Sequence, residues 1–203
     1  MNSDLLQLSE QNKYILETVI KFSIVILAYN ILISYTNNSK IEFDSVSITV
    51  MITFVLGTGL YLKFLEPNIP VITDHPIVKA VQKDILFFGT ILILVNVVMS
   101  FTGRSGIMSK YWIMNMVYVL IGILVYRIIV EPFLPVNNLL SGNSLELTND
   151  VLQFGTILAV VNTLTNRSLL DTRFLQPMAY LAIGFLVYYL LKMGYEKLMS
   201  MRN

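Results

Sequence analysis

Six long apolar stretches alternate with short polar segments along the chain. A helix crosses about 30 Å of hydrocarbon in roughly 20 residues, because each residue adds about 1.5 Å of rise. The runs are too long for the strands of an outer-membrane barrel and show no two-residue alternation. The pattern therefore predicts an all-α integral membrane protein. Its six transmembrane helices are expected over residues 15–35, 46–65, 84–102, 111–130, 150–165 and 175–195.

One segment of the sequence repeats. Residues 83–92 and 149–158 share an Asp at the second position and Phe-Gly-Thr-Ile-Leu at the last five. Both copies run on to an Asn at the same relative position, Asn96 and Asn162. An equal step back along the chain from Asn96 reaches Asn30, in a fainter copy. In the second helices, Gly57, Gly122 and Gly184 are each followed by a Tyr at the fourth position after the glycine.

These matches predict three tandem transmembrane hairpins related as parallel repeats, because each unit contains two spans and so enters the membrane in the same sense. The N-terminal segment covers residues 1–14. The hairpins cover residues 15–71, 72–136 and 137–203. The pattern leaves open whether they form a row or close into a pseudo-threefold bundle.

Polar residues inside the apolar stretches are the first candidates for a functional role. An unpaired amide in hydrocarbon costs several kcal/mol, so Asn30, Asn96 and Asn162 are expected to face protein. Hydrogen bonding between helices is the favoured interpretation, and a polar ring or substrate contact is the alternative. Neither interpretation needs a cofactor or a metal ion.

The repeated glycines and aspartates have structural interpretations. Gly89 and Gly155, like the glycines of the second helices, offer small surfaces on which a neighbouring backbone packs closely. Asp84 and Asp150 are expected to cap the starts of their helices, where a carboxylate complements the positive end of the dipole.

Two of the three hairpins close in the same way, with Glu66-Pro67 and Glu131-Pro132. Proline cannot continue a helix without losing a hydrogen bond, so each pair predicts the exit from the membrane. A carboxylate at that position could also anchor a partner protein.

Composition restricts the function classes. The chain is 55% hydrophobic and 13% charged, with a net charge of +1, no Cys and one His. No basic stripe is present to bind nucleic acid, and the sequence motifs of phosphate loops, zinc proteases and serine hydrolases are missing. The protein is therefore expected to bind no nucleic acid and to have no catalytic or metal site.

The distribution of positive charge predicts an orientation. With six spans both termini share one side, which carries the larger share of the 14 Lys and Arg residues. The positive-inside rule then places the termini on the cytoplasmic side.

The run from Asp150 to Val161, followed by Leu169-Leu170-Asp171 and the helix from Gly184 to Tyr188, resembles a family of small membrane proteins of nucleocytoplasmic large DNA viruses. The similarity is greatest over the third hairpin and decreases toward the first. The resemblance implies a protein of the virion's internal membrane, in contact with the bilayer and with minor capsid proteins, and it implies no catalytic residues.

The leading hypothesis is a structural membrane protein of a virus particle. A small channel or transporter is the first alternative, with the three asparagines around a polar path. An accessory subunit of a larger membrane complex is the second.

Overall fold

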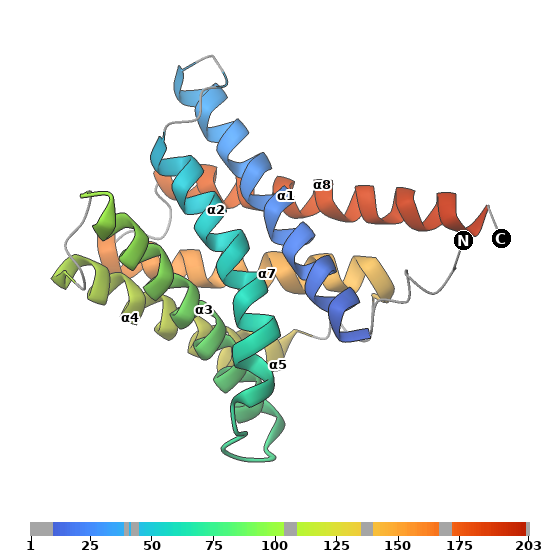
Figure 1. Ribbon diagram of the computed structural model, residues 1–203, viewed down its shortest axis with the longest axis horizontal. Coiled ribbons are helices and arrows are strands. Elements are labelled where there is room, and N and C mark those ends of the chain that lie inside the picture. The colour runs from blue at the N-terminus through green and yellow to red at the C-terminus, as the bar shows by residue number, and fades with distance from the viewer. Residues whose placement is uncertain are drawn as a thin grey trace.

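The computed structural model describes residues 10–38, 41, 45–103, 109–134, 140–166 and 172–201, which form long helices joined by short connections (Figure 1). Most of the predicted N-terminal segment therefore lies outside the described residues. The long α-helices are α1 (Glu10–Asn38), α2 (Ser45–Leu60), α3 (Pro76–Phe101), α4 (Lys110–Val125), α7 (Gly142–Asn166) and α8 (Thr172–Ser200).

Two of these helices continue through a π-helical turn. After α2 follow the π-helix η2 (Tyr61–Leu65) and the 3₁₀-helix η3 (Glu66–Asn68), and after α4 follow the π-helix η4 (Tyr126–Val130) and the short helix α5 (Glu131–Phe133). Each segment then ends in an extended residue, Ile69 or Leu134. The helices therefore end just after the two Glu-Pro pairs, where proline prevents continuation.

Five helical segments in the described part of the chain are long and apolar enough to cross a membrane. They cover Glu10–Asn37, Ser45–Asn68, Pro76–Phe101, Lys110–Phe133 and Leu175–Ser200. The helix α7 has a suitable length of 25 residues but does not qualify, because its first turns carry polar residues, among them Glu146, Asn149 and Asp150.

The starts of α3 and α7 correct one expectation. These helices begin at Pro76 and Gly142, so Asp84 and Asp150 lie two turns inside them and cap neither end. Proline suits the first turn of α3 because the amide it lacks has no partner there.

The helices pack in a closed order. The most extensive contacts pair α2 with α3, α4 with α7, and α8 with α1, while the helices within each predicted hairpin make fewer contacts. Each second helix thus packs on the first helix of the following hairpin, and α8 returns to α1 from the other end of the chain (Figure 1).

Aromatic rings from three different helices meet in the core. Phe154 of α7 lies 5.9 Å from Phe22 of α1 and 5.5 Å from Phe88 of α3, measured between ring centroids. Phe87 lies 5.8 Å from Phe22 and 5.1 Å from Phe88. The rings fill the space between α1, α3 and α7. The edge-to-face pairs that Phe88 makes with Phe87 and Phe154 add stability beyond burial.

Candidate functional site

A cavity of about 410 Å³ lies where α1, η4, α7 and α8 converge. Its wall includes three cationic side chains, Lys21, Arg127 and Lys192. Its carboxylates are Glu17, Glu131, Glu146 and Asp150, and four tyrosines complete much of the wall. So many charged groups in a mostly apolar chain make this cavity the candidate site, which we call the charged cavity.

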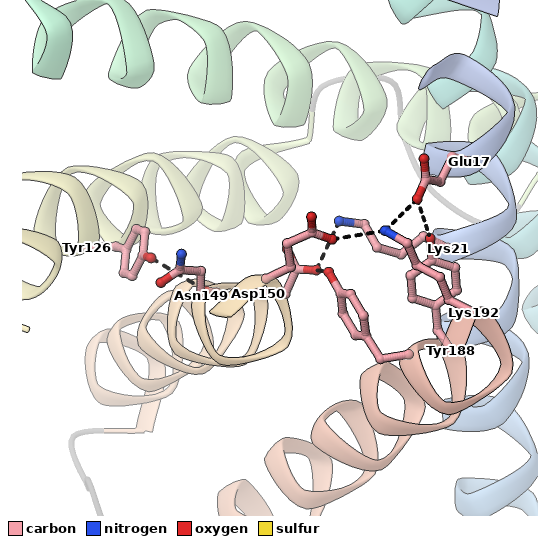
Figure 2. A network of polar contacts seen from close by, with 9 residues as sticks. Glu17, Lys21, Tyr126, Asn149, Asp150, Tyr188 and Lys192 are labelled. Carbon is pink, nitrogen blue, oxygen red and sulfur yellow. Dashed lines mark hydrogen bonds and ion pairs between the residues drawn. The ribbon is translucent and has the colours of Figure 1, made fainter. Parts of the chain in front are cut away.

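On one side of the charged cavity, Asp150 joins three helices. The Lys21 ammonium of α1 lies 2.9 Å from Oδ2 of Asp150, and the hydroxyl of Tyr189 on α8 donates to the same oxygen at 2.8 Å (Figure 2). The side chains of Lys21 and Asp150 are 21% and 17% exposed. This largely buried pair therefore ties α1 and α8 to α7.

Lys192 forms a second centre of charge. Its ammonium lies 2.6 Å from Glu17 on α1, and the Tyr188 hydroxyl donates to Glu17 at 3.5 Å (Figure 2). The ammonium also lies 3.1 Å from Glu146 on α7. Glu146 remains 54% exposed in these contacts. Lys192 thereby ties α8 to both α1 and α7.

Arg127 forms the third centre, on the π-helical turn η4. Its Nε donates to Asp84 at 2.7 Å and its Nη1 to Glu131 at 2.8 Å. Gln153 of α7 donates to the same oxygen of Asp84 at 2.8 Å. The Arg127 and Asp84 side chains are 19% and 14% exposed, so Asp84 is satisfied by two partners in a largely buried position.

The two π-helical turns place tyrosines in matching positions. The hydroxyl of Tyr61 donates to the backbone oxygen of Lys83 at 3.5 Å, and that of Tyr126 donates to the backbone oxygen of Asn149 at 3.4 Å. A π turn contains one extra residue relative to an α turn, and such turns are frequent at functional sites. In η4 the turn presents Tyr126 and Arg127 to the charged cavity.

The three asparagines lie outside the charged cavity. Asn96 is fully buried, while Asn30 and Asn162 are half-buried. Asn30 donates from Nδ2 to the backbone oxygen of Ile26 at 2.8 Å, which is a bond within its own helix. The amide of Asn30 therefore bonds within its own helix, whereas a hydrogen bond between helices was expected.

The glycines of the second helices lie at close contacts. A Cβ built at Gly122 would stand 2.8 Å from the Cα of Ile157, and one built at Gly184 would stand 2.9 Å from the backbone oxygen of Val25. At Gly57 the nearest atom is the end of a side chain, Cδ1 of Ile91, at 3.0 Å. Two of these positions therefore bring backbones together.

Gly89 and Gly155 differ from the expectation of close backbone packing. Among the described residues no atom lies within 4 Å of a Cβ at Gly89, and at Gly155 the nearest is the flexible end of Met178 at 3.3 Å. Neither position brings a neighbouring backbone close. The close backbone contacts lie instead at two glycines of the second helices, Gly122 and Gly184.

The Glu-Pro pairs make contacts within the chain. Glu66 lies 2.7 Å from the Lys83 ammonium of α3, while Glu131 pairs with Arg127 one turn earlier in its own segment. The Glu66 and Glu131 side chains are 27% and 43% exposed. Pro67 and Pro132 each follow these carboxylates in the last helical turn.

The charged cavity was not predicted from the sequence. No pattern in the sequence groups Lys21, Arg127 and Lys192, and Asp84 and Asp150 are expected from it only as helix caps. The repeat contained a usable signal, because Asp84 and Asp150 occupy equivalent positions in its two clearest copies.

Comparison of this chain with known protein families, curated proteins and solved structures finds no match.

Proposed function

We propose that the protein is a structural, non-conducting membrane protein with six transmembrane helices arranged as three repeated hairpins. The observation that carries the proposal is the closed order of helix contacts around an aromatic centre. Such a bundle forms a compact unit in a bilayer, and its outer surface is left for lipid and partner proteins.

The spacing of the close contacts supports the three-hairpin arrangement. Gly57, Gly122 and Gly184 contact Ile91, Ile157 and Val25 in turn. These three partners are equally spaced along the chain, at the same step that separates the repeated asparagines. Contacts at equivalent positions are expected when equivalent units pack in the same way. The contact from the third unit back to the first follows the same rule, as it would around a pseudo-threefold axis.

We assign α7 as the sixth span. Its 25 residues rise about 37 Å, which exceeds the thickness of the hydrocarbon core. It packs against both α4 and α8, so less of its surface faces lipid than a lone helix would expose. Its polar first turns, which include Glu146, belong at the membrane boundary.

The centre of the bundle argues against a channel. Phe22, Phe88 and Phe154 pack together where a conducting path along the axis would run. The charges of the cavity at one end are paired with one another. Aromatic side chains would therefore block the path of an ion. The ring contacts offer no polar group that could replace the ion's hydration shell.

For the location we propose the internal membrane of a virus particle, on the resemblance of the third hairpin, with the termini on the cytoplasmic side. Partner proteins of the capsid would contact the side that carries Glu66-Pro67 and Glu131-Pro132. Exposed groups are present there, including Lys79 near the start of α3.

The test is gentle extraction of the full chain after cross-linking of its lysines in the native membrane, followed by mass spectrometry. Capsid-type proteins are expected in a fixed ratio, cross-linked to Lys79. The matched control is Lys110, which lies at the opposite end of the bundle and is also exposed. Recovery of the protein alone would overturn the assignment to a particle, and cation flux through liposomes containing only this protein would overturn the non-conducting role.

A further inference from the structure

The charged cavity lies at one end of the apolar part of the bundle. From Lys21 to Asn38, the last residue of α1, the helix rises about 26 Å, and the segment from Lys110 to Arg127 rises by about the same length. The hydrocarbon core of a bilayer is about 30 Å thick. In a membrane these lengths place Lys21 and Arg127 together at the hydrocarbon boundary, which is the depth of phospholipid headgroups.

The charges around the charged cavity are nearly balanced. Three cations and four carboxylates line it, and each cation lies within 3.1 Å of at least one carboxylate. The carboxylates would repel a purely anionic ligand, and the three cations would repel a purely cationic one. A ligand with one anionic and one cationic group matches such a wall.

Donors for the anionic group remain on the cations. Arg127 uses Nε and Nη1 in its ion pairs, and its Nη2 makes no hydrogen bond to the described residues. Lys21 carries three N–H donors, and among the described residues its one hydrogen bond is to Asp150. Both side chains line the cavity, so the oxygens of one phosphate group can bind them while their ion pairs stay intact.

Acceptors for the cationic group lie on the more open side of the same cavity. Glu146 and Glu131 are 54% and 43% exposed, whereas the cations Lys21, Arg127 and Lys192 are about one-fifth exposed. A primary ammonium can donate to these carboxylates, which a quaternary ammonium cannot do.

We propose that the charged cavity binds the headgroup of a zwitterionic phospholipid with a primary ammonium, its phosphate at Arg127 and Lys21 and its ammonium at Glu146. A volume of about 410 Å³ lies within the usual range of ligand sites, about 300–1,000 Å³. The inference rests on the membrane embedding proposed above and is independent of the virion and of the structural role.

The experiment is native mass spectrometry of the purified full chain in mild detergent, titrated with phosphatidylethanolamine, phosphatidylcholine or phosphatidylglycerol. One phosphatidylethanolamine per chain is expected, with at least about tenfold weaker binding of phosphatidylcholine, as the loss of a hydrogen bond to a charged group predicts. Equal binding of all three lipids would overturn the proposal, because it would reflect only non-specific contact.

Two variants test the cavity itself. Glu146→Gln is expected to weaken phosphatidylethanolamine binding by about tenfold. Glu196→Gln is the matched control, because Glu196 is an exposed carboxylate near the same end of the bundle, bonded to Asn143 and outside the cavity. Unchanged binding in a folded Glu146→Gln protein would overturn the proposal, and thermal unfolding verifies that both variants fold.

A competition experiment distinguishes the membrane lipid from a soluble molecule with the same headgroup. Free phosphoethanolamine is expected to displace the lipid only at far higher concentration, because it lacks the acyl chains that hold the lipid in the bilayer. Displacement at equal concentration would overturn the assignment to a membrane lipid. A protein that binds the lipid but does not copurify with capsid proteins would contradict only the proposed function.

Discussion

Gly184 of α8 lies against the backbone of Val25 in α1, near the other end of the chain, and a Cβ added at Gly184 would stand 2.9 Å from the Val25 carbonyl oxygen. This contact joins the last helix to the first. Helices approach so closely only where one of them has no side chain. The closure of the bundle therefore depends on a small residue at this position.

Replacing Gly184 by alanine is expected to destabilise the bundle. The added methyl meets backbone atoms, which can make room only if a helix moves, at a cost of about 1–3 kcal/mol. The control is Gly89→Ala, because no described atom lies within 4 Å there. That change should be neutral or stabilise by up to about 1 kcal/mol through helix propensity. Thermal unfolding in detergent measures both, and equal melting temperatures would contradict the close packing at Gly184.

Removing the carboxylate of Asp84, which pairs with Arg127 of the charged cavity, is expected to be among the most costly single changes in this region. Asp84→Ala leaves the largely buried Arg127 without a main partner, which costs about 3–5 kcal/mol. Glu66→Ala breaks the more exposed pair with Lys83 and should cost less than about 1 kcal/mol. A double-mutant cycle of Asp84→Ala with Arg127→Met should give a large coupling energy. Additive effects would show that the pair contributes little.

The asparagines are expected to differ from one another. Asn96 is fully buried, so Asn96→Leu should lower the free energy of unfolding by about 1–3 kcal/mol by leaving buried groups unsatisfied. Asn30→Leu should change it by less than about 0.5 kcal/mol, because the recorded bond of Asn30 is to its own helix. Unfolding of the two variants in the same detergent provides the comparison, and the reverse order of effects would refute it.

The number of spans can be measured by cysteine labelling, because the chain contains no natural Cys. Single cysteines at Asp74 and Ser141 are expected to react with an impermeant maleimide from one side of sealed vesicles. Cysteines at Thr102 and Thr165 should react from the other side. If Ser141 and Thr165 label from the same side, α7 does not cross the membrane.

The helical segments were largely predictable, whereas the charged cavity was not. Long apolar runs determine where helices lie, because backbone groups in hydrocarbon must bond within the chain. The starts of α3 and α7 lie earlier than Asp84 and Asp150, the expected caps, because each helix also includes polar turns, which contain Lys79 and Glu146. Which cation meets which carboxylate depends on helices far apart in sequence, and Lys21 with Asp150 is an example.

The return of α8 to α1 has a consequence for biosynthesis. The surface of α1 around Val25 is covered by α8, a helix that is translated long after α1. At ordinary rates of synthesis about ten to thirty seconds separate the two helices. During this interval the first hairpin stays in the membrane with its packing surface at Val25 uncovered. Until α8 is made, this surface of the nascent chain is therefore open to lipid, chaperones or a second copy of the chain.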